Sequence, residues 1–381
     1  MLTELDETLH HQGPLTFEHV LTTDHRFYDR QLMGGFSPDG KAAFLAGITY
    51  FKNMNVVEGF VIAQSHSRTQ YNIRLTKQLR PLPMTKDASV GPLHLEIIEA
   101  FKHLRYVLAA GDYPVALDIN FHNLLQPRLE KPHFSRLDGR VTTDYLRYNQ
   151  IGRLSGRVEI DGERFDAHDW FGWRDHSWGV RPGVGGFEPM TGTRVGGGVA
   201  SASRTNGKGM FLLHQGFSNG REAGSFQVIE DGDGQRIYTE GEACIIGGEE
   251  AAVTSIDHEI VFKPGTRVFD HTTVQLGLSN GGSWKLESKA IGRPWVYRGA
   301  GYEGGFNDGQ GQGVWRGEQL LMEVDTYDIS DPERVVFPDG STGFPRHREQ
   351  LSTCIINGVA GHAYSPMFVI GDHPRWGLAG R

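Results

Sequence analysis

Apolar and polar residues alternate along much of the chain, with the period of two that is typical of β-strands. In the segment 115–122 the odd positions are apolar, whereas Asp118 and Asn120 occupy even positions. The segment 156–162 repeats this alternation and ends in an Asp-Gly turn dipeptide. Because successive side chains of a strand point to opposite faces, each segment predicts a strand with one face toward a core.

Short turn sequences rich in glycine, asparagine and aspartate separate these segments. They occur at residues 38–40, 137–139, 161–162, 218–220, 231–234, 279–281 and 338–340. Glycine accounts for 51 of the 381 residues, against a usual share of about 7%. Closely spaced turns between short strands predict an all-β protein of antiparallel sandwich or barrel type, with few short helices.

Two segments allow more than one interpretation. Residues 93–106 fit either an amphipathic helix or two strands joined near residues 100–102. The strand-rich neighbours on both sides favour two strands. A short helix near residues 145–150 is also compatible with the sequence.

A glycine-rich stretch, residues 182–198, interrupts the alternation near the middle of the chain. Such a break is typical of a junction between domains. We therefore expect an N-terminal domain over residues 1–170 and a C-terminal domain over residues 171–381, with the boundary between residues 161 and 197.

The charge and composition argue against a nucleic-acid partner and against an integral membrane span. The net charge is −8, and no run rich in lysine or arginine occurs, which argues against nucleic-acid binding. No stretch of about 18 uncharged apolar residues is present, so we expect no integral membrane span. The acidic start has no apolar signal core, and only two cysteines occur, so we expect a cytoplasmic protein. A homodimer stays open.

The segment 170–181 concentrates the candidate chemistry, because it contains three of the seven tryptophans beside histidine, arginine and aspartate. If this segment is a strand, Arg174, His176 and Trp178 share one face, and Asp175 and Ser177 share the other. A histidine can transfer protons near neutral pH, and an indole face can stabilise a cation. The alternative is a buried polar network that joins two sheets.

Weaker candidates lie elsewhere in the chain. His214 is a polar residue in an apolar strand, a setting more typical of a core histidine than of a catalyst. Trp173, Tyr148, Trp295 and Tyr297 are aromatic candidates for binding the substrate, although core packing is the better explanation for Trp295 and Tyr297. No spacing of histidines and cysteines matches a zinc site, and no Gly-x-Ser-x-Gly or dinucleotide motif occurs, so we expect no metal or other cofactor.

The run 174–179, Arg-Asp-His-Ser-Trp-Gly, with Gly-x-Val at 156–158 and Asp-Gly at 161–162, resembles the signature of the hydroxyneurosporene-synthase-like family. That family includes carotenoid hydratases and AttH-like proteins, and the similar order extends over residues 27–367. The resemblance implies two lipocalin-like antiparallel β-barrels or half-barrels, packed together around a pocket for an apolar ligand. It also implies hydratase, cyclase or isomerase chemistry without a cofactor, and His176 and Trp178 match the family's motif.

The sequence departs from that family at one position of chemical importance. Carotenoid hydratases have a Tyr-Asp-Asp run on a strand after the motif, whose carboxylate is the expected proton donor. The corresponding segment here, residues 213–215, reads Leu-His-Gln. His214 is therefore the candidate replacement for proton transfer, and a terpenoid, steroid, polyketide or phenolic substrate is as compatible as a carotenoid.

These observations lead to one main hypothesis and one rival. The main hypothesis is a cofactor-independent lyase or isomerase of hydratase, dehydratase or cyclase type, acting on a hydrophobic small molecule. In it His176 and His214 transfer protons, Arg174 orients or binds an anionic oxygen, and Trp178 packs on the substrate. Asp175 supports the site from the opposite face. The rival is a non-catalytic lipocalin-like carrier, because the same fold binds apolar ligands without chemistry.

Overall fold

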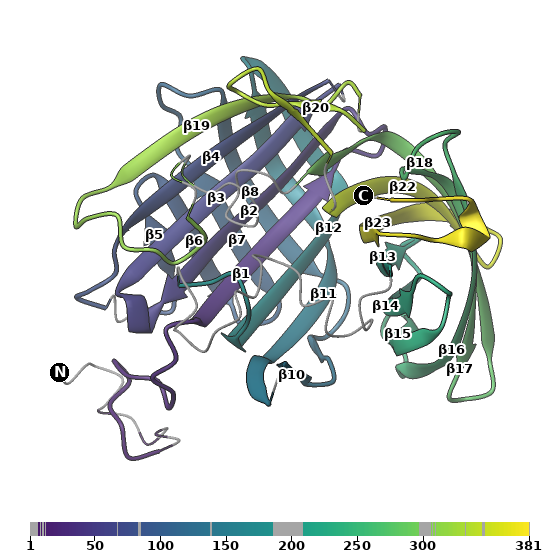
Figure 1. The fold of residues 1–381 in the computed structure, drawn as a ribbon, viewed down its shortest axis with the longest axis horizontal. Coiled ribbons are helices and arrows are strands. Elements are labelled where there is room, and N and C mark those ends of the chain that lie inside the picture. Colours follow the sequence, from purple (N-terminus) through teal and green to yellow (C-terminus); the bar gives the residue numbers. More distant parts are fainter. Residues whose placement is uncertain are drawn as a thin grey trace.

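The computed structural model describes residues 7, 9, 11, 13–66, 68–82, 85–137, 139–185, 209–296, 306, 308, 310–331, 333–344 and 347–380. Regular structure in these ranges is almost entirely β-strand (Figure 1). The helical elements whose full bounds lie in these ranges are two short 3-10 segments, η2 (Lys52–Met54) and η3 (Pro374–Trp376). The expected all-β class with few short helices is confirmed. Within the same ranges, no helix has the length and apolar character needed to cross a membrane.

The first sheet contains fifteen strands, all antiparallel to their neighbours. Its main path runs β21-β20-β19-β4-β3-β2-β1-β12-β11-β8-β7-β6-β5, and β9 and β10 pair with β11. Its strands are β1 (Phe27–Phe36), β2 (Ala42–Phe51), β3 (Val56–Ser65), β4 (Thr69–Gln78), β5 (Ala88–Val90), β6 (Leu93–Glu99), β7 (His103–Leu108), β8 (Val115–Asn123), β9 (Arg128–Leu129), β10 (His133–Leu137), β11 (Arg140–Ile160), β12 (Glu163–Val180), β19 (Leu321–Asp328), β20 (Val335–Val336) and β21 (Thr342–Gly343).

The second sheet is a closed barrel of eight strands. Its strands are β13 (Met210–Ser218), β14 (Glu222–Asp231), β15 (Arg236–Ile245), β16 (Ala251–Phe262), β17 (Phe269–Leu278), β18 (Ser283–Val296), β22 (His347–Ile356) and β23 (Val359–Ile370). Between β18 and β22 the chain returns to the first sheet and adds β19–β21. The predicted class, two antiparallel β-barrels or half-barrels packed together, is confirmed, with one closed barrel and one large open sheet (Figure 1).

The expected division into residues 1–170 and 171–381 stays a prediction. The strand β12 extends through the middle of the expected boundary and belongs to the first sheet over its full length. The strands β19–β21 also belong to the first sheet, although they lie far along the second half of the chain. The first sheet therefore contains strands from both halves of the sequence, and no single boundary separates the residues of the two sheets.

The two ambiguous segments are both strands. Residues 93–106 form β6 and most of β7, which join at residues 100–102, so the preferred interpretation is confirmed. The alternative of a short helix near residues 145–150 is excluded, because these residues are extended in the middle of β11. There β11 pairs along its length with β12. Continuous pairing on a neighbouring strand satisfies the backbone hydrogen bonds that a helix would satisfy locally.

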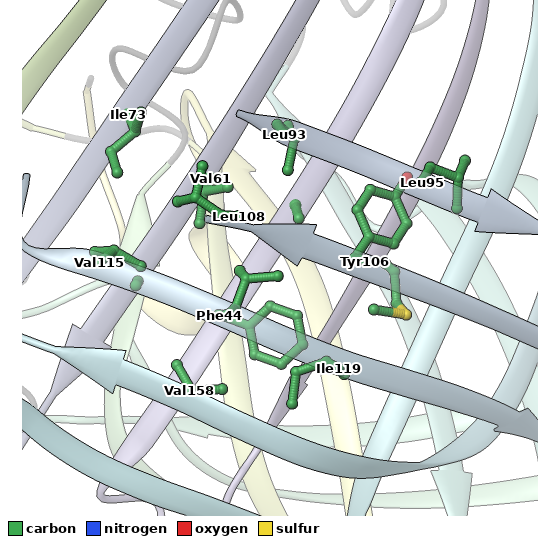
Figure 2. Packing of buried hydrophobic residues seen from close by; sticks show 14 of the residues in the cluster. Phe44, Val61, Ile73, Leu93, Leu95, Tyr106, Leu108, Val115, Ile119 and Val158 are labelled. Carbon is green, nitrogen blue, oxygen red and sulfur yellow. The ribbon is translucent and has the colours of Figure 1, made fainter. Parts of the chain in front are cut away.

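The first sheet curls over one of its faces, which we call the inner face. A Cβ atom added to Gly59 of β3 would lie 2.4 Å from Val90 Cγ1 of β5, so these two strands pack closely. Buried apolar side chains from β1–β8, β11 and β12 fill this face. Figure 2 shows part of this inner-face core, in which Phe44, Tyr106 and Val158 come together from separate strands.

A second apolar layer lies between the first sheet and the barrel, and we call it the interface core. Trp173 of β12 packs on Tyr364 of β23, with 5.0 Å between the ring centroids. Gly216 of β13 allows a close approach, because a Cβ atom there would lie 2.6 Å from Ile151 Cδ1 of β11. The barrel interior has an apolar core of its own. One face of β12 therefore packs in the inner-face core, and the other face packs in the interface core.

Candidate functional site

Strand pairing brings the motif residues of β12 beside polar residues of two neighbouring strands. β12 lies between β1 and β11 in the first sheet. In this register His176 lies opposite Gln31 on one side and Tyr148 on the other, and Arg174 lies opposite Gln150. Since directly paired residues point to the same face of a sheet, these five side chains converge on one surface.

The pairing also identifies the face on which this group lies. Arg174 pairs with Met33, a residue of the inner-face core. Asp175 pairs with Leu32, a residue of the interface core. Side chains of a strand alternate between faces, so His176 lies with Arg174 on the inner face. The two-faced arrangement expected for this strand is therefore confirmed.

His176 is held by three side chains through both ring nitrogens. Its Nε2 lies 2.7 Å from Asp29 Oδ1, and its Nδ1 lies 3.2 Å from the Tyr148 hydroxyl and 3.1 Å from Gln31 Nε2. An ionised carboxylate only accepts hydrogen bonds, so Nε2 is assigned the proton and donates to Asp29. The Nδ1 lone pair then accepts from the phenol of Tyr148 and the amide of Gln31.

The carboxylate of Asp29 is ionised in this arrangement. Burial raises the pKa of Asp29. The hydrogen bond to His176 and its electrostatic interaction with that ring lower the pKa by a larger amount, so it lies below its usual value. The side chains of His176 and Asp29 are 24% and 34% exposed. The pair is therefore accessible from solvent, and its carboxylate can stabilise a positive charge on the imidazole.

Arg174 is a buried cation directed at the same phenol. Its Nε donates to Gln150 Oε1 at 2.7 Å, and its Nη1 lies 3.2 Å from Gln31 Oε1 and 3.4 Å from the Tyr148 hydroxyl. The guanidinium also lies 5.7 Å from the ring centroid of Phe121. Arg174 is only 2% exposed, so its guanidinium is directed at Gln150, Gln31 and the Tyr148 oxygen and not at a site open to a bound ligand.

Aromatic rings border the His176 pair on its accessible side. The Trp178 ring lies 5.1 Å from the His176 ring and 6.3 Å from the Tyr148 ring, centroid to centroid. Trp178 and Tyr148 are both partly exposed. An apolar surface therefore lies next to a phenol, an imidazole and a carboxylate that are joined by hydrogen bonds.

The sequence matches the model of one protein family, described as a family of unknown function, DUF8625, over residues 2–343. The chain belongs to this family. No curated protein sequence matches this member of the family. The family description assigns no activity, so the functional argument rests on the site itself.

One of the solved structures similar to this DUF8625 protein shares its fold, with a TM-score above 0.5. A Nitrosomonas europaea protein with the provisional name AttH aligns over 91% of this chain and 93% of its own, with 13% identity and a TM-score of 0.51. Kievitone hydratase from Nectria haematococca aligns over 92% of this chain and 90% of its own, with 11% identity and a TM-score of 0.40. CghA with Sch210972 aligns over 90% of this chain and 88% of its own, with 9% identity and a TM-score of 0.46. The predicted resemblance to AttH-like folds is confirmed.

The structure does not bring His214 to His176. His214 lies on β13 in the barrel, and its ring packs edge-on against Trp173, with 5.4 Å between centroids. Trp173 belongs to the interface core, so both residues lie on the opposite side of β12 from the His176 pair. Burial and the charge of Arg147 lower the pKa of His214 from 6.5 to about 3, which keeps the ring neutral at physiological pH.

This burial predicts an acid-sensitive fold. The unfolded chain protonates His214 below pH 6.5, whereas the folded protein resists protonation down to about pH 3. The folded state therefore loses stability as pH falls through this window. Between pH 7 and pH 5, wild type is expected to lose about 2 kcal/mol more free energy of unfolding than His214→Gln. Urea titrations at both pH values measure this difference, and equal losses would contradict the assignment.

A buried polar network lies beside His214 between the first sheet and the barrel. The Glu130 carboxylate accepts from Arg147 Nε at 2.9 Å, lies 2.7 Å from His133 Nε2 and accepts from Asn149. Burial raises the pKa of Glu130, but the Arg147 guanidinium and His133 hold it well below its usual value. Arg147 also donates to Gln227 of the barrel at 2.8 Å. The network therefore joins the two sheets through hydrogen bonds.

Asp175 lies on this side of β12 as well, where it was expected to support the motif. Its pKa is raised by burial, even though the charges of Arg30 and Arg147 lower it. Its Oδ1 has no hydrogen-bond partner among the residues that the structure describes. The motif sequence therefore combines a partly exposed histidine, hydrogen-bonded to Asp29, on one face with a buried polar interface on the other.

The remaining predicted aromatic residues lie apart from β12. Trp295 is in β18 of the barrel, where it pairs with Glu349 of β22. Tyr297 lies outside the described residues. Within the described part of the chain, no cluster of three or more histidine, cysteine or carboxylate side chains has the arrangement of a metal site.

Three members of the site, Asp29, Gln31 and Gln150, were not predicted from the sequence. Asp29 and His176 are separated by 147 positions, so no local motif connects them. The signal that was available is that Asp29 and Gln31 alternate on one face of a predictable strand. Their identity as partners of His176 requires the order and the register of the strands, which the sequence pattern does not specify.

Proposed function

We propose that this protein is a cofactor-independent lyase or isomerase of hydratase, dehydratase or cyclase type. Its substrate is a hydrophobic small molecule, such as a terpenoid, steroid, polyketide or phenolic compound. The observation that supports this proposal is the hydrogen-bonded series Tyr148–His176–Asp29, with distances of 3.2 and 2.7 Å. The resemblance of the 174–179 motif to carotenoid hydratases supports the same reaction class.

The geometry allows one proton to be removed and another to be delivered. His176 Nδ1 takes the phenolic proton of Tyr148, and Asp29 stabilises the resulting imidazolium. The Arg174 guanidinium, 3.4 Å from the phenol oxygen, stabilises the phenolate. In a dehydration, the phenolate removes a proton from a carbon next to the one that bears a hydroxyl group. The imidazolium protonates that hydroxyl, which leaves as water, so Tyr148 and His176 return to their neutral forms; hydration is the reverse.

The hydrophobic substrate class follows from what surrounds the phenol. The partly exposed ring of Trp178 presents apolar surface beside Tyr148, with 6.3 Å between the ring centroids. A groove of about 440 Å³ on β7, β8 and β11 has a different character, because Asp118, Arg157 and Glu159 are among its lining residues. An apolar substrate fits the aromatic surface at Tyr148 and Trp178 better than this charged groove.

One observation favours the carrier function as a second candidate. Both ring nitrogens of His176 are hydrogen-bonded within the protein, which is the arrangement expected of a purely structural histidine. A carrier binds its ligand without chemical change, so it requires the apolar surface but no proton transfer. The two functions therefore differ in whether the Tyr148 hydroxyl is needed once the ligand is bound.

The deciding experiment first identifies a ligand and then tests turnover. Native mass spectrometry of the purified protein detects a co-purifying small molecule, which guides a panel of alkenes and their hydroxylated products. Tyr148→Phe keeps the ring and removes the proton, so we expect kcat to fall by about 10²-fold or more, with ligand affinity little changed. Tyr113→Phe is the matched control, because its hydroxyl donates to the backbone carbonyl of Ala109 between β7 and β8. Full turnover in Tyr148→Phe excludes the mechanism, and binding without turnover in wild type identifies a carrier.

A further inference from the structure

We infer that Phe101 is a substrate-contacting, specificity-determining residue that forms one wall of the site for a planar, conjugated part of the ligand. This inference deepens the proposed function and rests on it for the reaction. Phe101 does not belong to the 174–179 motif of β12. It lies between β6 and β7, in a different region of the first sheet. Its position, backbone conformation and contacts all point to a role beyond the fold.

Phe101 lies at the tip of the hairpin that joins β6 and β7. The backbone N–H of Lys102 donates to Glu99 O at 3.1 Å and closes a four-residue turn, in which Phe101 is the third residue. The Phe101 ring packs edge-to-face on the Tyr148 ring, with 5.8 Å between centroids and 71° between planes. The hairpin tip therefore lies directly against the phenol that we assign to proton transfer.

The backbone of the turn is tied to the same group of residues. Gln150 Nε2 donates to the carbonyl of Phe101 at 2.8 Å, and Gln150 Oε1 accepts from Arg174 Nε at 2.7 Å. One glutamine thus connects the hairpin tip to the cation that faces Tyr148. The position of Phe101 relative to the site is consequently set by hydrogen bonds as well as by ring packing.

The fold alone does not account for a phenylalanine at this place. Its φ angle is +65°, in the left-handed region that favours glycine and is costly for a bulky side chain. The residue is 45% exposed, so burial offsets only part of that cost. Glycine at the third position of such a turn would be free of strain. Backbone strain of this kind is characteristic of functional sites.

The arrangement of the rings indicates the shape of the ligand. Phe101 and Trp178 both contact the Tyr148 ring edge-on, at 5.8 and 6.3 Å between centroids. A flat ligand that covers the phenol therefore reaches both neighbouring rings. Offset and edge-to-face contacts with aromatic rings favour planar conjugated groups over compact aliphatic ones. The ligand class is accordingly an aromatic or polyene compound.

The test uses the neutral aromatic dye N-phenyl-1-naphthylamine as the probe, with binding measured by fluorescence titration and stability by thermal melting. Phe101→Ala removes the ring and keeps the strain, whereas Phe101→Gly removes both. We expect both variants to bind the probe about tenfold more weakly than wild type. We expect Phe101→Gly to melt about 1 to 2 °C above Phe101→Ala. Ile355→Ala in the barrel, at a residue that is also 45% exposed, controls for loss of an exposed apolar side chain and should bind like wild type.

The possible results separate this inference from the proposed function. Unchanged probe affinity in both Phe101 variants, or no binding of the probe by wild type, overturns the inference. A Phe101→Gly melting point at or below that of Phe101→Ala also overturns it, because it removes the argument from strain. Weakened probe binding in the Phe101 variants, combined with full turnover by Tyr148→Phe, supports the ligand contact and rejects the proposed proton-transfer mechanism.

Discussion

Asp29→Asn is expected to lower kcat of the proposed reaction by about 10²- to 10⁴-fold while the protein stays folded. The amide has the same shape as the carboxylate but no charge, so it cannot stabilise the imidazolium that forms on His176. It can also donate a hydrogen bond to Nε2, which would place the proton of the neutral ring on Nδ1. Nδ1 would then no longer accept the proton of Tyr148. The change thus removes both the charge and the tautomer on which proton transfer depends.

Steady-state kinetics on a substrate from the panel, together with the melting temperature, measure this effect. Asp118→Asn is the matched control, because Asp118 forms a hydrogen-bonded ion pair with Arg105, at 2.7 Å, on the exposed surface. We expect this control to retain wild-type kcat. If Asp29→Asn and Asp118→Asn are equally active, the carboxylate of Asp29 has no part in catalysis.

Glu130→Gln is expected to have the largest effect on stability, a loss of about 3 to 5 kcal/mol in the free energy of unfolding. The Glu130 side chain is 3% exposed and that of Arg147 is 17% exposed. Removing the carboxylate charge leaves the Arg147 guanidinium largely buried without the anion that compensates its desolvation. The same change weakens the hydrogen-bond network between the first sheet and the barrel.

Urea denaturation at pH 7 measures this loss, and two further variants show its cause. Glu163→Gln removes the partner of His66 in a pair whose side chains are about half exposed, so we expect a change below about 1 kcal/mol. The double variant Glu130→Gln/Arg147→Met removes both charges and should recover much of the stability. A small loss in Glu130→Gln, or no recovery in the double variant, would show that the buried charges are not coupled in this way.

The candidate site was only partly predictable from the sequence. Alternation along β12 correctly separated His176 and Arg174 from Asp175. Tyr148 was selected as an aromatic residue for binding, whereas the structure places its hydroxyl within hydrogen-bonding distance of His176. His214 was selected as a second proton-transfer group because of its position in an aligned motif, but it lies on the far side of the sheet. A sequence motif specifies which residue types occur along a strand. It does not specify against which face of another sheet those side chains pack.

The hairpin at residues 93–106 shows the same limit on a smaller scale. The composition of the neighbouring segments correctly favoured two strands joined near residues 100–102. The left-handed conformation of Phe101 and its contact with Tyr148 had no counterpart in the hydrophobic pattern. Turn conformation at a bulky residue depends on the packing of its ring, which involves a strand more than 40 positions away in the sequence.

The sequence by itself determined that the protein is all-β, which segments are strands, and which residues of β12 share a face, because these features follow from an alternation that acts over a few neighbouring residues. Only the tertiary structure decided that Asp29, Gln31 and Tyr148 surround His176, and that His214 belongs to the interface with the barrel. Those relations depend on strand order and register between segments that are distant in the chain. In an antiparallel sheet, a shift of one residue in register would turn each of these side chains to the opposite face.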